Sequence, residues 1–486
     1  MWDLALKGRD SRRLGYVTLA GLAVTGWLLL QQWRELSVTP HGALAEPAFA
    51  MVTIDRFGTF FKLFTVGALA IVTLFVLADR TEKKHDIGEY FFLLLGAAIG
   101  IFFMVSTNNL LLLVLGLELL SLASYSLAGF HKGERRSGEA AMKYVIFGSL
   151  STGIMLYGVS LLYGLTGTID LNLMGRGGAE GFPVGLAAQF VTSPIPVAVA
   201  VVLVLAGFAY KVSVVPFHFW TPDVYEGAPT PVTTFLAVAS KAAGFAVLLR
   251  FVGALFMVEG VAETVGAYGQ RIGLLLAILA AVTMTLGNLS ALRQASLKRL
   301  LAYSSIAHAG YALMGLACMT ASGFEAAMFY LAAYYCMNLG AFGFLLYFQG
   351  VTGDETVESL KGMGWKAPLV SITMVAFLVS LTGLPPTIGF FGKYLLFVEG
   401  IHAGLTWLVV VAAVNSVISL FYYFRVARAL FLSAPSEATP APQPWFAGLL
   451  VALGILTVVG GLWNSPLQDW SKAGQESLGL DQGVKK

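Results

Sequence analysis

Three lysines lie inside long apolar segments of this chain, where no adjacent loop can hydrate their charge. Lys211 follows the uncharged run 181–210, Lys393 follows the uncharged run 367–392, and Lys241 lies half-way along a third apolar segment. An ammonium group at the middle of a bilayer costs about 2.5–3.5 kcal/mol on insertion scales. Such residues persist mainly where they face water, a partner charge or a route for protons. The pattern predicts a membrane protein that moves protons or ions.

The composition agrees with a membrane protein. The chain is 57% hydrophobic and 12% charged, which is about half the charged share of a soluble domain. Its 54 glycines suit transmembrane helices that pack closely. A net charge of +3 is too small to indicate a nucleic-acid partner. Cys318 and Cys336 both lie in apolar segments, as small core residues do, rather than as a disulfide or a metal-binding pair.

Apolar segments long enough to cross a bilayer fill most of the chain. At about 20 apolar residues per crossing, the sequence predicts about thirteen spans. They cover residues 14–30, 57–78, 90–107, 110–130, 138–165, 194–215, 230–251, 272–290, 297–319, 324–349, 367–383 continuing to 397, 406–431 and 444–462. We therefore expect an all-α, polytopic transmembrane bundle that forms a single membrane domain over 1–486, with no signal peptide, separate soluble domain or nucleotide-binding loop.

The basic residues in the loops and near the ends of these spans are unevenly divided between the two sides. The richer side carries Lys7, Arg9, Arg12, Arg13, Arg80, Lys83, Lys84, Lys132, Arg135, Arg136, Arg293, Lys298, Arg299, Lys361, Lys366, Arg425 and Arg428. The other side carries Arg34, Arg56, Lys62, Arg176, Arg250, Arg271, Lys472, Lys485 and Lys486. Because cytoplasmic loops are enriched in lysine and arginine, the N-terminus should be cytoplasmic and the C-terminus should lie on the far side.

Proline interrupts two of the predicted spans beside a buried lysine. Segment 214–218 follows Lys211, and segment 383–389 precedes Lys393. Proline removes a helix hydrogen bond and clashes with the preceding turn. The freed backbone groups must then be satisfied by protein or water. The sequence therefore predicts two broken helices, although a simple kink in a packing helix is the alternative at either position.

The two interruptions are five spans apart, in corresponding places of two halves. This spacing predicts a transporter built from two five-helix repeats, 90–251 and 272–431. Because a five-span unit has an odd number of crossings, its copy must be inverted across the membrane.

Glu118 is a fourth ionisable residue inside an apolar segment, after the uncharged run 90–117. A lysine nearby would hold this carboxylate charged, and a change in their separation or hydration would release a proton. An amine removed from water gives up its proton more readily, so Lys211 and Lys241 can both accept and release one. The alternatives are a structural hydrogen bond for Glu118 and, for Lys393, an interaction with the carbonyl groups exposed at the helix break.

Three further residues are candidates for the same proton relay. His308 can pass protons between the two halves because histidine titrates near neutral pH, unless it is a hydrogen-bonded core residue. His218, beside the first break, has the same two interpretations. Lys143 lies near the cytoplasmic start of its span, where a lysine can also extend its amine to the surface. Asp223 and Glu226 follow the break and can collect protons or cap a helix.

At these residues the chain resembles the antiporter-like membrane subunits of respiratory complex I, and in particular the subunit N family of bacterial NADH-quinone oxidoreductase. The matching stretches are 116–122, 210–225, 239–241, 300–311 and 383–393. They occur in the family's order and the resemblance covers nearly the whole chain. Lysine at position 393 is the subunit N pattern, since subunit M has glutamate there, and the long lateral helix of subunit L is missing after residue 462.

The resemblance implies roles for these residues. Glu118 and Lys211 would form the input pair, Lys241 the central relay and Lys393 the output residue. Relatives usually have one more span at the start, and residues 1–7 look like the tail of that helix. Either the start site is set too late or the span has been lost; the proton-carrying core is unaffected in both cases.

The sequence thus predicts a proton-translocating subunit of a bacterial inner-membrane NADH:quinone oxidoreductase. Its partners would be the other membrane and peripheral subunits of the complex and the lipid bilayer, with no nucleic acid. This subunit would bind no cofactor or metal, since NADH and quinone react elsewhere in the complex. Rival interpretations are a subunit of an Mrp-type sodium/proton antiporter or membrane-bound hydrogenase, and a purely structural spacer. Subunits that co-purify with the chain would distinguish them.

Overall fold

The computed structural model describes residues 13–39, 42–43, 51–79, 87–176, 185–257, 261–434 and 443–480. Within these ranges the regular structure is helical, with four isolated β-bridges and no β-strand. The α-helices are α2 (Arg13–Leu36), α3 (Arg56–Ala78), α4 (Ile87–Val105), α5 (Leu110–Ala128), α6 (Arg135–Thr166), α7 (Leu171–Arg176), α8 (Leu186–Thr192), α9 (Pro194–Val212), α10 (Trp220–Gly227), α11 (Thr230–Phe235), α12 (Lys241–Phe256), α13 (Val261–Ala291), α14 (Leu297–Ala317), α15 (Ala321–Thr352), α16 (Pro368–Thr382), α17 (Ile388–His402), α18 (Thr406–Phe431), α19 (Pro444–Leu462) and α20 (Ser465–Glu476). The π segment η2 (Leu236–Ser240) and the 3₁₀ turns η3 (Glu358–Leu360) and η4 (Met363–Trp365) complete them.

The prediction of an all-α membrane bundle is confirmed. In the described ranges, 12 helices are long and apolar enough to cross a membrane, or up to 13 if a bent pair around Pro368 counts as one span. The predicted eleventh span is divided into α16 and α17, each of 15 residues. Neither half reaches the length of a full crossing alone, because about 20 residues are needed.

Both predicted helix breaks are present, with slightly different bounds. Helix α9 ends at Val212 and α10 begins at Trp220, whereas α16 ends at Thr382 and α17 begins at Ile388. The residue after each first half, Ser213 or Gly383, has a left-handed backbone, with φ of 64° and 88°. A left-handed residue ends an α-helix, so each helix stops before its prolines are reached. The two proline segments each contain a cis peptide bond, Val215–Pro216 and Pro385–Pro386.

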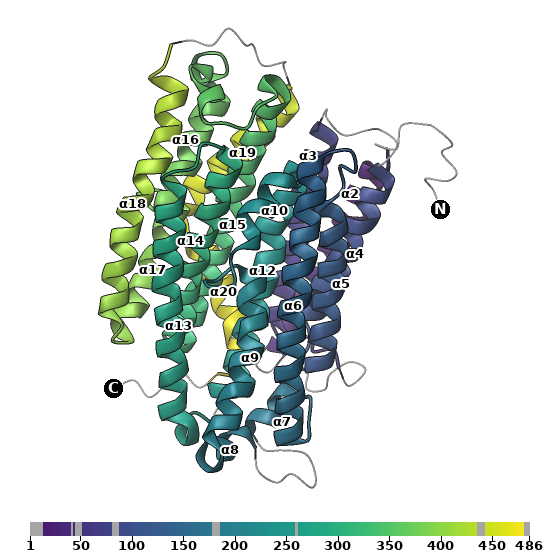
Figure 1. Ribbon diagram of the computed structural model, residues 1–486, viewed down its shortest axis with the longest axis vertical. Helices are drawn as coiled ribbons and strands as arrows, with labels where there is room; N and C mark the ends of the chain where they lie inside the picture. Colours follow the sequence, from purple (N-terminus) through teal and green to yellow (C-terminus); the bar gives the residue numbers. More distant parts are fainter. Residues whose placement is uncertain are drawn as a thin grey trace.

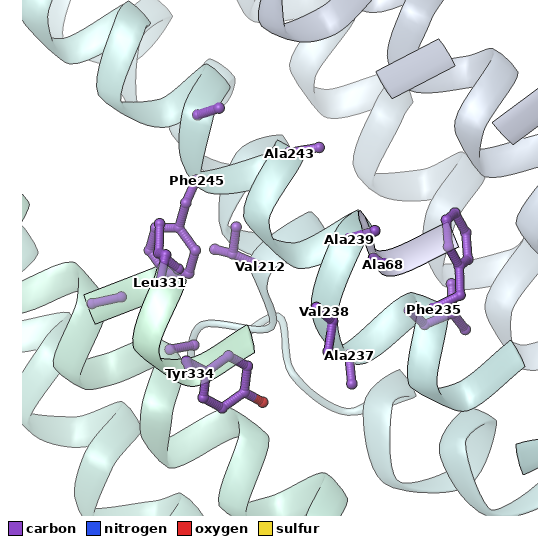
Figure 2. Packing of buried hydrophobic residues seen from close by; sticks show 14 of the residues in the cluster. Ala68, Val212, Phe235, Ala237, Val238, Ala239, Ala243, Phe245, Leu331 and Tyr334 are labelled. Atoms are coloured by element: carbon purple, nitrogen blue, oxygen red, sulfur yellow. The ribbon is translucent and has the colours of Figure 1, made fainter. Parts of the chain in front are cut away.

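The predicted seventh span, 230–251, is not a single regular helix. Helix α11 passes into the five-residue π segment η2 directly before Lys241, where α12 begins. Short π segments inside helices are rare and frequently occur at functional sites. Figure 2 shows the apolar packing around this segment, with Ala68 of α3 on one side and Leu331 and Tyr334 of α15 on the other. The sequence carries no signal for this irregularity.

The helices form two flanks around a central group (Figure 1). Helices α2 to α6 lie on one flank, α13 and α16 to α18 lie on the other, and α10 and α12 run between them. Helix α20 was not predicted; it follows the last span and packs back against α3 and α15. There Trp470 stacks on Trp33, and Ser477 accepts a hydrogen bond from the backbone of Phe57. The inverted relation of 90–251 to 272–431 stays a prediction.

Several loops predicted to share one side of the membrane do lie together. Asp79, His131, Ser296 and Asp354 come from four separate loops and helix ends, and they line one polar cavity. The predicted helix tail at 1–7 and the predicted loop charges Lys7, Arg9, Arg12, Arg80, Lys83, Lys84, Lys485 and Lys486 lie outside the described residues.

Candidate functional site

Lys211 is buried in the last turn of α9, immediately before the first break. Its side chain is 2% exposed, and Nζ donates a hydrogen bond of 3.3 Å to Oγ of Ser121 on α5. Its aliphatic stem lies against Gly244, where a Cβ atom would come within 3.2 Å of Lys211 Cγ. Gly244 is three residues after Lys241 on α12. Because glycine has no side chain, α12 and α9, which carry Lys241 and Lys211, can approach each other here.

Glu118 lies close to Lys211 but does not form an ion pair with it. Ser121, which Lys211 contacts, is three residues after Glu118 and so lies on the same face of α5. The carboxylate is half-buried and accepts a hydrogen bond of 2.6 Å from Thr152 of α6. Among the described residues no salt bridge within 4.0 Å joins Glu118 and Lys211, although their charges interact. The predicted input pair is therefore separated by a gap.

Among the described residues, Ser305 of α14 is the one hydrogen-bond partner of the Lys241 amine. Its side chain is 2% exposed, and Nζ donates to Ser305 Oγ at 2.5 Å and to the Ser305 carbonyl at 3.0 Å. The hydroxyl of Tyr334 donates to the same Oγ at 2.7 Å. The central lysine is thus joined to α14 and α15 through hydroxyl groups.

His308 follows Ser305 by one turn of α14 and lies among tyrosines. Its Nδ1 is 2.5 Å from the hydroxyl of Tyr330, and its Nε2 is 3.2 Å from the hydroxyl of Tyr423. The charges of both Lys241 and Lys393 act on the buried imidazole. His308 is therefore a hydrogen-bonded core residue that also lies between two of the buried lysines.

Lys393 is bound at the second break. Nζ donates to the carbonyl of Thr382, the last residue of α16, at 2.9 Å and to Ser416 Oγ of α18 at 3.1 Å. It also lies 4.3 Å from the ring centre of Tyr311, whose hydroxyl is 2.9 Å from Ser416 Oγ. The sequence left open that Lys393 interacts with a carbonyl group exposed at the break. The bond to Thr382 confirms this interaction. The same amine also joins a hydroxyl network.

The three buried amines share one chemical environment. In the described part of the chain, Lys211, Lys241 and Lys393 have no carboxylate within 4.0 Å, and their hydrogen-bond partners are neutral hydroxyl or carbonyl groups. Neutral partners do not fix the amine in its charged form, unlike a buried carboxylate. Hydroxyl groups both donate and accept protons. This arrangement is suited to proton transfer rather than to a permanent ion-pair scaffold.

Lys143 belongs to a separate charged cluster at the basic side. Its Nζ is 2.6 Å from Glu139 and 2.7 Å from Asp223, and Arg299 bonds Asp223 at 2.8 Å and Glu226 at 2.7 Å. Burial alone would raise the pKa of Asp223, but the hydrogen bonds and charges of Lys143 and Arg299 hold that pKa below its ordinary value. The structure does not bring Lys143 into contact with the buried lysines.

A polar cavity of about 540 Å³, which we call the vestibule, lies beside this cluster. Its lining residues are Asp79, His131, Glu134, Arg136, Glu226, Gly227, Ala228, Pro229, Thr230, Gln294, Ala295, Ser296, Lys298, Arg299, Gln349, Gly353, Asp354, Glu355 and Thr356. Lys298 lines this cavity, although its side chain is only 3% exposed. Its Nζ donates hydrogen bonds to the carbonyl of Ala228 at 2.7 Å and to Glu355 at 3.2 Å. Lys298 is thus a buried residue rather than a solvated loop charge.

His218 is buried within the first break and packs against Phe219, with ring centres 4.5 Å apart. Its Nδ1 has no hydrogen-bond partner among the described residues. No hydrogen bond between described residues joins it to a buried lysine. Of the seven candidates, the structure connects Lys143 to the charged cluster beside the vestibule, and it leaves His218 apart from the other five. We call this group of Lys143, Glu139, Asp223, Glu226 and Arg299 the vestibule cluster.

Sequence reasoning missed the buried ion pair of Asp55 and Arg250. Arg250 bonds both carboxylate oxygens, at 2.8 and 3.0 Å, and also the carbonyl of Val105. By its position at the end of an apolar segment, Arg250 is expected to be a loop charge, but its side chain is only 4% exposed. The tyrosines around His308 were also missed, since tyrosine is common in apolar spans and its partners are distant in sequence.

A family model described as "NADH:quinone oxidoreductase/Mrp antiporter, TM" matches residues 107–419, which hold all seven candidates. NADH-quinone oxidoreductase subunit N of Anaeromyxobacter sp. (strain Fw109-5) is 41% identical over 499 residues, covering 99% of this chain and 93% of that one. NADH-quinone oxidoreductase subunit N 2 of Sorangium cellulosum (strain So ce56) is 43% identical over 490 residues, covering 97% and 92%.

Solved structures agree with this relationship. A chain of respiratory complex I from Thermus thermophilus is 34% identical, with a TM-score of 0.77 and coverage of 96% of this chain and 95% of that one. A chain of the Mrp complex from Dietzia sp. DQ12-45-1b has a TM-score of 0.82 at 23% identity, covering 98% and 94%, and shares the fold alone. The chain therefore belongs to the NADH-quinone oxidoreductase subunit N family, as an antiporter-like, multi-pass membrane subunit.

Proposed function

We propose that this chain translocates protons within an NADH:quinone oxidoreductase, along a mid-membrane relay of Glu118, Lys211, Lys241, His308 and Lys393. The observation that carries the proposal is the placement of three buried amines against neutral hydroxyl and carbonyl groups. A charged amine in such a place is costly, and a hydrated route shared by all three offsets that cost.

The first half of the relay runs from Glu118 to Lys241. The gap between Glu118 and Lys211 is bordered by the hydroxyls of Ser121 and Thr152. A water molecule in such a polar gap bridges two groups nearly as well as a direct hydrogen bond does. From Lys211 the proton passes to Lys241, whose helix contacts the Lys211 stem at Gly244.

The second half runs through α14 to the second break. Lys241 contacts Ser305, and His308 lies one turn further along the same face. Tyr311, another turn on, shares Ser416 with Lys393. The imidazole can pass a proton because one ring nitrogen can accept a proton while the other donates one. Lys393 then releases the proton beyond the break.

Family membership supports a proposal for the cellular setting as well. We propose that the chain lies in the inner membrane of a bacterium, with its basic side facing the cytoplasm, beside other membrane and peripheral subunits of complex I. NADH oxidation and quinone reduction take place in those other subunits, and their free energy drives the relay. This chain would bind neither NADH nor quinone.

Lys241 gives the most direct test, because it is the one titratable group proposed between the input pair and His308. Lys241→Ala should sharply reduce NADH-driven proton uptake by inverted membrane vesicles, normalised to assembled complex. Lys241→Arg should also reduce it, since guanidinium does not deprotonate in proteins and cannot pass a proton on.

Lys143→Ala is the control, because Lys143 lies in the vestibule cluster and is 36% exposed. It should reduce uptake much less than either Lys241 variant. Near-normal uptake in both Lys241 variants would mean that the buried amine is structural, and the relay would have to be abandoned.

A further inference from the structure

Tyr225 is a fully buried tyrosine whose hydroxyl makes no hydrogen bond within the described part of the structure. Most buried polar side chains do have a partner, so each exception needs a physical reason. The ring is held between Trp220 and Phe342, with ring centres 6.2 and 6.3 Å away. The backbone carbonyl accepts a hydrogen bond of 3.0 Å from Thr233. Packing thus fixes the side chain while the hydroxyl is left for another partner.

Ser305 supplies that partner by its hydrogen-bonding capacity. The Tyr225 hydroxyl lies close enough to Ser305 and Tyr334 for their electrostatic effect to reach it, although it forms no well-aligned hydrogen bond with either. Ser305 Oγ already accepts from Lys241 at 2.5 Å and from Tyr334 at 2.7 Å. A serine hydroxyl has two acceptor lone pairs and one proton to donate. With both lone pairs occupied, Ser305 has one proton left to donate, and the unpartnered oxygen of Tyr225 is an acceptor close to it.

Tyr225 directly precedes three residues of the vestibule wall in the sequence, although it does not line the cavity itself. The next residue, Glu226, lines the cavity and accepts a hydrogen bond of 2.7 Å from Arg299. Gly227 and Ala228, which follow, line the same cavity. Helix α10 therefore carries one residue in the vestibule wall and, directly before it, a buried hydroxyl beside the residue that binds Lys241.

We propose that Tyr225 is a proton-transfer residue that gives Lys241 a second supply of protons, from the vestibule, beside those that pass from Lys211; this inference rests on the proposed role of Lys241 in the relay. When the amine is neutral, it takes the proton of Ser305 Oγ. Ser305 then takes the hydroxyl proton of Tyr225, and Tyr225 takes a proton from vestibule water. One proton moves from the vestibule to Lys241, and each hydroxyl ends with the one proton it had.

The test uses the assembled complex in inverted membrane vesicles. Tyr225→Phe removes one oxygen atom and keeps the ring, so the packing of α10 is preserved. NADH-driven proton uptake per assembled complex should fall clearly below that of the unmodified complex, because Lys241 then depends on the supply from Lys211 alone. Tyr90→Phe is the matched control, because Tyr90 is equally buried and packs against Phe91 and Phe130 of the other flank. Its uptake should be close to that of the unmodified complex.

Two further variants separate proton transfer from packing. Tyr225→His keeps a donor and an acceptor but fills the site less well than phenylalanine, so it should recover part of the uptake only if protons pass through this position. The double variant of Ser305→Ala and Tyr225→Phe should lose no more proton uptake than the more severe of the two single variants, because both substitutions act on one route.

Three outcomes would each overturn this inference. The first is normal proton uptake in Tyr225→Phe, and the second is uptake in Tyr225→His that is no higher than in Tyr225→Phe. The third is a double variant in which the two losses of uptake multiply. Lys241→Ala distinguishes the two levels of the argument. If Lys241→Ala is impaired while Tyr225→Phe is normal, only the role of Tyr225 fails. If Lys241→Ala pumps normally, the relay itself fails.

Discussion

Gly383 leaves the space that the side chain of Lys393 occupies. A Cβ atom on Gly383 would lie 2.7 Å from Lys393 Cδ and 3.5 Å from Nζ. The same glycine has φ of 88° and ends α16, and the carbonyl of the preceding residue, Thr382, accepts a hydrogen bond from Nζ. One residue thus both ends the helix and makes room for the amine. The second break and the output lysine form a single structural unit.

Gly383→Ala should therefore displace Lys393 and reduce proton uptake. The added methyl group meets the lysine stem, and a left-handed backbone costs a residue with a Cβ atom about 1–2 kcal/mol. Gly404→Ala separates these effects, because Gly404 has φ of 75° and nothing within 4 Å of its Cβ position. Both variants carry similar backbone strain, but only Gly383→Ala should lower uptake per assembled complex. Equal uptake in the two would show that Lys393 tolerates the displacement.

Tyr330→Phe should lower proton uptake by changing the partners of His308. The variant removes the hydroxyl that lies 2.5 Å from Nδ1 and leaves the ring in place. Loss of one hydrogen bond changes the relative energies of the imidazole forms by about 0.5–1.5 kcal/mol, which corresponds to a roughly 2- to 10-fold loss in rate. Tyr347→Phe, on the same helix and packed against Phe348 and Phe446, should leave uptake unchanged. Unchanged uptake in Tyr330→Phe would place His308 outside the relay.

The sequence was sufficient for the architecture because its signals are local. Long uncharged runs fix the spans by length, and proline fixes the two breaks beside Lys211 and Lys393 by removing helix hydrogen bonds. A lysine or glutamate inside such a run stands out because its burial is costly. These features can be seen without knowing which helices touch.

The partners of these residues could not be predicted, because each lies on a different helix. Ser305 is 64 residues from Lys241, and Thr152 is 34 residues from Glu118. Serine, threonine and tyrosine are also inexpensive in apolar spans, where they often bond to their own helix, so their presence is not distinctive. The π segment before Lys241 and the return of α20 against α3 likewise depend on packing rather than on local pattern.

Asp223→Asn should destabilise the vestibule cluster at neutral pH. The folded-state pKa of Asp223 lies below its ordinary value of 3.8, because hydrogen bonds from Lys143 and Arg299 outweigh the cost of burial. A carboxylate with a lowered pKa contributes stability that is fully present above the unfolded pKa and is lost as the pH falls through the folded pKa.

The melting temperature of this subunit in the purified complex should therefore differ between Asp223→Asn and the unmodified protein by a constant amount from pH 7 to about pH 5. The difference should shrink only near and below the ordinary value. Glu358→Gln is the control, since the Glu358 side chain is 75% exposed in a surface pair with Lys361. A difference that already shrinks between pH 7 and pH 6 would mean that the pKa of Asp223 is raised in the folded protein.

Arg250→Met should strongly reduce the amount of this subunit in the assembled complex. The change leaves the carboxylate of Asp55 buried without its partner, which costs about 3–5 kcal/mol for a buried pair. Arg250→Lys should not restore assembly, because an ammonium cannot reproduce the two bonds that guanidinium makes to Asp55. Asp55→Leu combined with Arg250→Met should recover much of the loss, since removing both charges leaves neither unpaired.

Arg271→Met is the surface control, because Arg271 is exposed beside Tyr268. Quantifying the subunit in purified complex checks all four variants. If the double variant assembles no better than Arg250→Met alone, the pair does more than neutralise itself. Assembly would then need its other bonds: those of Arg250 to Val105, at the end of α4, and to Asn108, and the one by which Asp55 caps α3 at Gly58.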